Sequence, residues 1–209
     1  MVDRAEREAI LKRALTYPYA TPERSYLFRD GRAEELPEGF DLGGRSPLLS
    51  YGANAAPEAL ALKLASLPGE PLPVVRSQLR DFDVVYSAHV SPYGAVPATL
   101  LESPGTVAPV FVLHPTAAQH ALLTATELNY DLVEVGGATA YRSKHGCLEL
   151  DGSALALAAV RSEGRTLPEL DQPAVLDRVR AHLAPGLELE DFIHACIERG
   201  GIKPLPAFD

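Results

Sequence analysis

The residues best suited to chemistry begin with a loop of small side chains in the first third of the chain. Tyr51, Gly52, Ala53 and Asn54 follow a short apolar run that is typical of a strand, and a helix is expected to begin at Pro57. Small residues allow a ligand to approach the backbone closely. Unpaired N–H groups ahead of a helix suit a carboxylate or an oxyanion. The pattern therefore indicates a candidate anion-binding loop.

Glu127 is the candidate acid or base. It stands at the end of a helix that is expected over residues 117–128 with Thr116 as its cap, just before a strand expected to begin at Tyr130. Leu123, Leu128 and Tyr130 would give its carboxylate partly apolar surroundings. Desolvation raises the pKa of a carboxyl group, and a glutamate then becomes a usable general base near neutral pH. The plainer alternative is a solvated glutamate in the last turn of a helix.

A metal site is the second chemistry to consider, because each cysteine follows a histidine by two residues. His145 with Cys147, and His194 with Cys196, would together supply four zinc ligands. Structural zinc sites more often use Cys-x-x-Cys or His-x-x-x-His spacing, and Cys196 fits an apolar helix face. We predict no metal and expect idle or buried thiols.

Composition limits the classes of partner. The chain has 209 residues, of which 46% are hydrophobic and 22% charged, and its net charge is −9. An acidic protein is poorly suited to nucleic acid or to an anionic membrane surface. No apolar run reaches the roughly 18 residues that a membrane span needs, and the N-terminus lacks the apolar core of a signal peptide. We therefore expect a cytoplasmic protein with a small-molecule partner, without nucleic acid or membrane.

The elements that must position these residues follow from periodicity and turn signals. A helix is expected over residues 4–15 and a hairpin over residues 25–36, turning on Asp30 and Gly31. Short strands are expected between residues 72 and 113, with a turn at residues 103–105, and again over 130–135 and 138–142. Residues 153–160 suit a helix or a strand equally. Two helices, over 174–183 and 189–199, are expected near the end of the chain, the second closed by Gly200 and Gly201. Because the strands cluster, we predict an α+β fold, a compact sheet or barrel of short strands, and not a doubly wound sheet.

In their order along the chain, these features resemble a known family. Tyr51-Gly-Ala-Asn54 after a strand is similar to the Tyr-Gly-Ser-Asn loop of the gamma-glutamylcyclotransferase-like proteins. Gly94-Ala-Val-Pro-Ala-Thr-Leu-Leu-Glu-Ser-Pro-Gly105 resembles the family's Gly-x-x-x-Ala-Thr…Ser-Pro-Gly segment. A strand, a helix and a glutamate before Tyr130 follow. Each motif is short, and the resemblance rests on their succession over roughly residues 47–142.

The resemblance implies a small mixed β-barrel with packed helices and a cavity at one mouth. In the family, backbone N–H groups of the loop hold the substrate carboxylate. A glutamate takes a proton from the substrate's α-amino group, which attacks the γ-carbonyl and releases 5-oxoproline and an amine or amino acid, with no metal or cofactor. Matched to this chain, the substrate-binding residues would be Tyr51, Gly52, Ala53 and Asn54, and the catalytic residue Glu127.

The chain also departs from the family pattern. Ala53 stands where the family has serine, which removes a hydroxyl but keeps the backbone donors. Leu128 stands where glycine is usual, and Tyr130 arrives sooner after Glu127 than in the family. A shortened connection can displace the carboxylate enough to slow a reaction about 100-fold. The rival hypothesis is therefore a non-catalytic small-molecule-binding or interaction protein that retains the fold.

Three segments follow from the extent of the resemblance. Residues 45–150 form the expected barrel, residues 1–44 an N-terminal helix and hairpin extension, and residues 151–209 a C-terminal helical extension packed on the same domain. The extensions would close the pocket, cover sheet edges or make a contact in a homo-oligomer.

Overall fold

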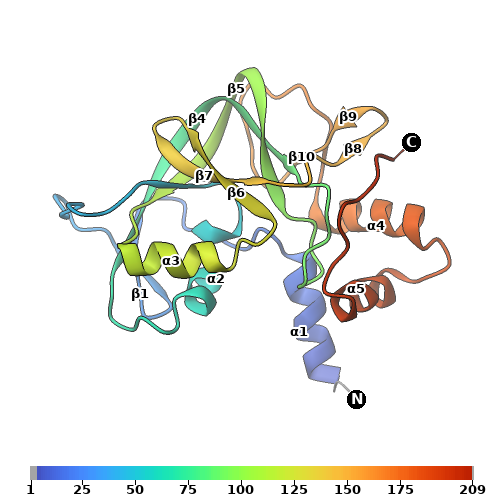
Figure 1. Cartoon of the computed structure of the whole chain (residues 1–209), viewed down its shortest axis with the longest axis horizontal. Coiled ribbons are helices and arrows are strands. Elements are labelled where there is room, and N and C mark those ends of the chain that lie inside the picture. Colours follow the sequence, from blue (N-terminus) through green and yellow to red (C-terminus); the bar gives the residue numbers. More distant parts are fainter. Residues whose placement is uncertain (1–3, 209) are drawn as a thin grey trace.

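Two long antiparallel strands, β4 (Leu72–Tyr86) and β5 (Ala98–Leu113), form the centre of the fold (Figure 1). The computed structural model describes residues 4–208. Its helices are α1 (Arg4–Leu15), the 3₁₀ turn η1 (Ala53–Ala55), α2 (Pro57–Lys63), α3 (Ala117–Ala125), α4 (Gln172–Leu183) and α5 (Leu189–Glu198). Among the described residues, no helix has both the length and the apolar character needed to cross a membrane.

The strands form one mixed sheet in the order β11-β10-β4-β5-β3-β7-β6. The remaining members of this path are β3 (Leu48–Ser50), β6 (Tyr130–Val135), β7 (Ala138–Ser143), β10 (Ala156–Leu157) and β11 (Glu169–Leu170). A hairpin of β1 (Tyr26–Arg29) and β2 (Arg32–Glu35) pairs with β4, and β8 (Glu149–Leu150) pairs separately with β9 (Ser153–Ala154). The α+β class is confirmed. The pairings within residues 4–208 leave the sheet open, so they do not make a closed barrel.

The expectation of short strands between residues 72 and 113 is wrong. β4 has 15 residues and β5 has 16, and the two pair along almost their whole length. A register shift lies between Arg80 and Phe82, where Asp81 has a φ of +61° and its carboxylate accepts the Gly105 N–H at 2.8 Å. The turn-forming residues 103–105 therefore mark a bulge that bends two continuous strands instead of ending them.

Several local predictions are confirmed by the structure. The hairpin turns on Asp30 and Gly31, which have φ values of +49° and +78°. Thr116 caps α3 in a capping box with Gln119. Gly200 and Gly201 close α5, their N–H groups bonding back to carbonyls of the last turn. Helix α3 ends at Ala125, three residues before the expected end at 128, and the segment 153–160 contains the short strands β9 and β10 and no helix.

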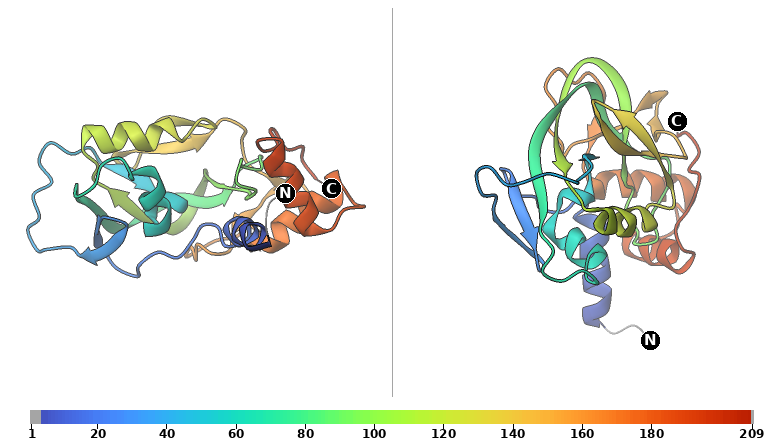
Figure 2. Two further views of the ribbon diagram at one scale, coloured as in Figure 1. Left: turned by 90° about the horizontal axis from the view of Figure 1, so that it is seen from below. Right: turned by 60° about the vertical axis from the view of Figure 1, so that its left-hand side comes forward.

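The helices cover the two ends of the sheet. In Figures 1 and 2, α2 and α3 lie together at one end, and α1, α4 and α5 lie together at the other. Leu60, Leu72, Leu113 and Leu123 belong to the apolar cluster at the first end. The larger cluster combines sheet residues with buried residues of the second end, which include Ala14, Leu176, Val179, Phe192 and Ile193. Both terminal segments therefore contribute to the same core as the sheet.

A buried ion pair ties the C-terminal segment to the sheet. Asp83 of β4 is fully buried, and its carboxylate accepts two hydrogen bonds of 2.8 Å from the Arg165 guanidinium and one of 2.7 Å from Ser162. Arg165 also bonds to Glu169 at 2.6 Å. This network gives the buried carboxylate and guanidinium hydrogen-bonding partners, which offset the free-energy cost of removing charges from water.

Candidate active site

A cavity of about 340 Å³ lies beside the loop that connects β3 to α2. Its walls come from the end of α1 and the residues after it, the β3–α2 loop, α2, residues 89–98 and the loop between α3 and β6. All five residues singled out in the sequence line it: Tyr51, Gly52, Ala53, Asn54 and Glu127. The structure thus brings together two segments that are more than seventy residues apart in the chain.

Glu127 reaches the loop through its carboxylate. Its Oε1 atom accepts a hydrogen bond from Asn54 Nδ2 at 3.0 Å, and only 14% of its side chain is exposed. The expected apolar surroundings are wrong in part, because Leu128 is 77% exposed. The helix ends at Ala125, so Glu127 lies in the connection to β6 and turns towards polar partners.

Lys63 is the partner that sequence reasoning missed. Its Nζ atom lies 2.5 Å from Glu127 Oε1 and 2.7 Å from Asn54 Oδ1, so the three side chains form a closed triangle. Lys63 is the last residue of α2, which begins at Pro57 as expected. One signal was present in the sequence: Lys63 is the single basic residue between Arg45 and Arg76. A lone cation in an apolar helix suggests a partner elsewhere in the fold.

The backbone of the loop offers free donors. The N–H groups of Gly52, Ala53 and Asn54 donate no hydrogen bond within the described part of the chain. The carbonyls of Gly52 and Ala53 are already used by the N–H groups of Ala55 and Ala56, at 3.3 and 2.9 Å. Successive free N–H groups make a concave site for an anion.

Two tyrosines hold this loop in place. The Tyr51 hydroxyl donates to the carbonyl of Tyr141 in β7. The Tyr17 hydroxyl accepts the Ala98 N–H at 2.9 Å and packs so closely that a Cβ atom on Gly52 would lie 2.5 Å from its oxygen. Glycine is required at position 52 because of this close approach.

The cavity is rich in phenol groups. Six of the eight tyrosines of the chain line it, namely Tyr17, Tyr19, Tyr51, Tyr93, Tyr130 and Tyr141. Burial raises the pKa of each, that of Tyr141 to about 12. These side chains therefore stay neutral at physiological pH and give the cavity apolar faces with hydroxyl edges.

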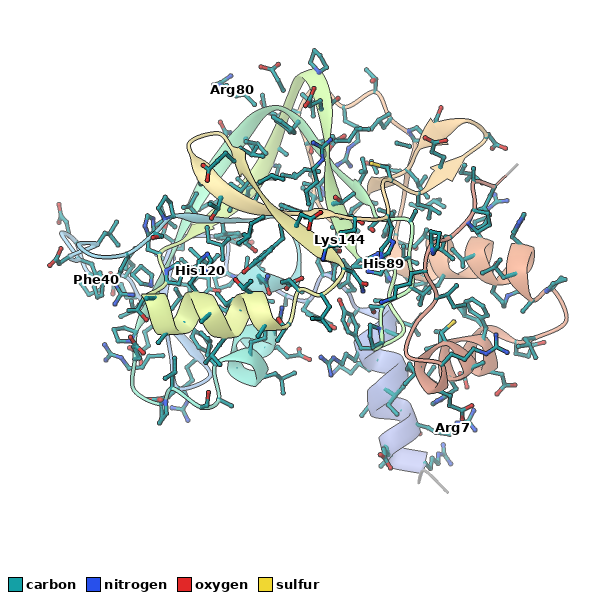
Figure 3. All side chains as sticks on the ribbon, in the orientation of Figure 1. Arg7, Phe40, Arg80, His89, His120 and Lys144 are labelled. Atoms are coloured by element: carbon teal, nitrogen blue, oxygen red, sulfur yellow. The ribbon has the colours of Figure 1, made fainter. Side chains whose placement is uncertain are left out.

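A neutral histidine completes the wall. Burial, and then the nearby charge of His145, lowers the pKa of His89 to about 3. Its Nδ1 atom lies 2.6 Å from the Ser87 hydroxyl, which lies 2.6 Å from the Ser143 hydroxyl. Figure 3 shows His89 where the sheet approaches the C-terminal helices. The chain of hydroxyls holds the imidazole ring against rotation.

The four candidate zinc ligands do not form a metal-binding group. Within residues 4–208, no three or more histidine, cysteine, aspartate or glutamate side chains lie close enough together to hold a metal ion. Cys147 pairs with the backbone of Ser87 beside β4, and Cys196 is buried in α5. Burial raises the pKa of both thiols, that of Cys196 to about 11, so neither is an activated nucleophile.

Comparison of the chain with models of protein families, with curated proteins and with solved structures finds no match. The functional argument therefore rests on the chemistry of the cavity.

Proposed function

We propose that the protein is a gamma-glutamylcyclotransferase-like enzyme, which cyclises a small γ-glutamyl derivative by general acid/base catalysis. The observation that carries the proposal is the hydrogen bond of 3.0 Å between Glu127 and Asn54, inside a cavity that the loop also lines. A base and a row of anion-binding N–H groups then face the same small molecule. The mixed sheet, in which β3 pairs with β5 antiparallel and with β7 parallel, supports a fold of that family as part of the same proposal.

The reaction follows from these positions. The free N–H groups of Gly52, Ala53 and Asn54 would hold the substrate's carboxylate or the developing oxyanion. Glu127 would accept a proton from the α-ammonium group, and the free amine would attack the γ-carbonyl carbon. The tetrahedral intermediate collapses when the same carboxyl group returns that proton to the departing nitrogen, and the second proton lost by the ring nitrogen converts the released amine to an ammonium group. The products are 5-oxoproline and an amine, and the balance needs neither a cofactor nor a metal.

Lys63 is a positioning residue in this scheme. Lys63 and Asn54 both bind Oε1 of Glu127, whereas Oε2 accepts no hydrogen bond within the described residues. Oε2 is therefore the oxygen that would take the substrate's proton. The small volume of the cavity and the acidic charge of the chain suit a small-molecule substrate in the cytoplasm, not a nucleic acid or a membrane surface.

The proposal is tested by comparing wild type with Glu127→Gln on a panel of γ-glutamyl compounds, following release of 5-oxoproline. Turnover should fall by about 100-fold or more in the variant, because the proton acceptor is lost. Glu134→Gln, an exposed change in neighbouring β6, is the matched control and should behave as wild type. Circular dichroism checks that both variants fold. Turnover that survives Glu127→Gln would exclude the mechanism.

The ion pair between Lys63 and Glu127 also favours a second candidate, a binding protein without catalysis. A carboxylate held by a lysine at 2.5 Å resembles a structural pair as much as a free base. This candidate predicts that γ-glutamyl compounds bind to wild type and to Glu127→Gln, and that neither protein releases 5-oxoproline.

A further inference from the structure

His89 has one ring nitrogen that the protein itself does not use. Its side chain lines the cavity, and the residue is only 1% exposed. The Nδ1 atom lies 2.6 Å from the Ser87 hydroxyl, whereas Nε2 has no hydrogen-bond partner among the described residues. A buried polar atom without a protein partner at the wall of a cavity calls for an explanation, and a ligand contact is one.

The hydrogen-bond chain behind His89 determines which ring nitrogen carries the proton. The Ser143 hydroxyl accepts the His145 backbone N–H at 3.0 Å and lies 2.6 Å from the Ser87 hydroxyl. Both hydroxyl hydrogens find an acceptor in this chain only if Ser143 donates to Ser87 and Ser87 donates to Nδ1. Burial lowers the pKa of His89 to about 3, so the ring is neutral at physiological pH. Nε2 therefore carries the single ring proton and is a neutral donor.

Asn129 supplies a second donor to the same cavity. Its Oδ1 atom accepts a hydrogen bond of 3.0 Å from Lys203 Nζ and lies 3.3 Å from His145 Nε2. An ammonium group can only donate, so the amide oxygen must face Lys203. The Nδ2 atom has no partner in the described part of the chain, and Asn129 lines the cavity. The rings of His145 and His89 have centroids 5.1 Å apart, which places the two free donors in one part of the wall.

The C-terminal segment holds both donors in position. Ile202 exchanges backbone hydrogen bonds of 2.8 and 3.0 Å with Val90, the residue after His89. Lys203, the next residue along this segment, orients the Asn129 amide. Donors that are already fixed lose little conformational entropy when a ligand binds. This segment lies outside the part of the chain that resembles the family.

The charges near this part of the wall favour an oxygen acceptor. Burial, followed by the charges of Lys203 and Lys144, lowers the pKa of His145, so both ammonium groups act on this region (Figure 3). Lys144 pairs with Asp131 at 3.6 Å, whereas Lys203 makes no ion pair with a described residue. The positive potential stabilises an oxygen that carries a partial or full negative charge.

We propose that His89 and Asn129 form a second hydrogen-bonding subsite of the cavity, which binds a carbonyl or carboxylate oxygen of the ligand through two neutral N–H donors. This inference rests on the proposed function, in which the N–H groups of the β3–α2 loop bind one carboxylate of a γ-glutamyl compound. The subsite would bind a different acceptor oxygen of the same molecule. Lys203 is a positioning residue, because it acts through Asn129.

The donor on His89 is tested by NMR of isotopically labelled histidine side chains in the wild-type protein. Long-range proton–nitrogen spectra distinguish the two neutral tautomers, and His89→Gln identifies the signal among the six histidines. We expect the Nε2–H tautomer, and a shift of its signal when γ-glutamylglycine is added to saturation. An Nδ1–H tautomer, or a signal that stays unchanged when the ligand binds, would overturn the proposal.

The donor on Asn129 is tested by Asn129→Asp, which keeps an oxygen for Lys203 and replaces the free NH₂ group with a second oxygen. Calorimetry should show that γ-glutamylglycine binds about tenfold more weakly or worse, because a donor is exchanged for a negative charge, and KM should rise by a similar factor. Gln78→Glu is the matched control. It makes the same amide-to-carboxylate change at an exposed position of β4 outside the cavity lining, and it should bind as wild type does.

The outcomes separate this inference from the proposed function. If wild type releases 5-oxoproline and Asn129→Asp binds γ-glutamylglycine as tightly as wild type, the subsite is excluded and the proposed function stands. If wild type binds the compound without releasing 5-oxoproline, and the variant binds it weakly, the subsite is supported and the enzymatic proposal fails. If wild type does not bind the compound, both proposals are overturned.

Discussion

The ammonium nitrogen of Lys63 lies 2.5 Å from Oε1 of Glu127, and Asn54 hydrogen-bonds to both side chains. Exposed fractions of 20% for the lysine side chain and 14% for the glutamate place this pair between a surface and a buried ion pair. A charge in such a position depends on its partner, because water cannot fully replace a lost counter-ion. The pair therefore connects the stability of the loop region to its chemistry.

We expect Lys63→Met to lower the free energy of unfolding by about 2 kcal/mol, between the values typical of exposed and of buried pairs. The double variant with Glu127→Gln should lose less than the sum of the single losses, with a coupling of about 1 kcal/mol. Urea denaturation measures all four free energies. Lys144→Met is the control, because the pair of Lys144 with Asp131 is exposed and 3.6 Å long, so its loss should cost under about 0.5 kcal/mol. Additive losses for Lys63 and Glu127 would contradict the coupling.

Gly52→Ala should disrupt the loop for a steric reason. The new Cβ would lie 2.5 Å from the Tyr17 oxygen, which the Ala98 N–H holds in place. We expect a loss of about 1–3 kcal/mol in stability, typical of overpacking, together with loss of ligand binding. Tyr17→Phe in the same chain should recover part of that stability because it removes the obstructing oxygen. Gly186→Ala, where a Cβ meets no atom within 4 Å, is the matched control. If Tyr17→Phe brings no recovery, the clash is not the cause.

The elements that depend on local signals could be predicted from the sequence. Periodicity and end signals predicted α1, the hairpin at Asp30 and Gly31, the cap at Thr116 and the end of α5. The long strands could not be recognised, because a turn signal such as that at residues 103–105 looks the same in a bulge and in a true turn. Which strands pair, such as β3 with β7 in parallel, is a non-local property that periodicity does not contain.

The candidate site also contains residues that could be predicted from the sequence and residues that could not. The loop residues and Glu127 were identified from their residue types and their order, and the structure places them around one cavity. Lys63 was missed, because its role depends on how α2 packs against a segment that is distant in the chain. The phenol-rich wall was missed for the same reason, since its six tyrosines come from five separate segments of the sequence.

Ser50→Ala should separate stability from ligand binding. Ser50 lines the cavity, is 4% exposed, and its hydroxyl has no hydrogen-bond partner in the described structure. An unpaired buried hydroxyl is costly, so its removal should raise the free energy of unfolding by about 1 kcal/mol. Ser87→Ala is the matched control, because that buried hydroxyl lies 2.6 Å from both His89 and Ser143 and its loss should destabilise the fold. If the Ser50 hydroxyl serves a ligand, the stabilised variant will bind γ-glutamylglycine more weakly, as calorimetry would measure.

His89 should make the protein less stable in mild acid. Burial lowers its pKa in the fold from 6.5 to about 3, so between these values the unfolded chain binds a proton that the folded chain does not. Stability is then complete above pH 6.5 and falls as the pH drops towards 3, by up to about 1.4 kcal/mol per pH unit. From about pH 7 to about pH 5 the loss from this one group is about 2 kcal/mol. His89→Gln removes the titrating group, so urea denaturation should show a flatter pH dependence in the variant.

The two other histidines with a lowered pKa set the baseline for this measurement. Burial lowers the pKa of both His114 and His145, so these residues also contribute to the pH dependence of stability, and His89→Gln keeps their smaller contributions. Only the difference in slope between wild type and His89→Gln therefore reports on His89. His114→Gln is the matched control, because His114 is outside the cavity lining and its loss should leave most of the slope in place. Equal slopes for wild type and His89→Gln would mean that the buried imidazole accepts a proton in the folded state. In that case the charge of the cavity walls, which include His89, would change with pH, and ligand binding should be measured again at each pH.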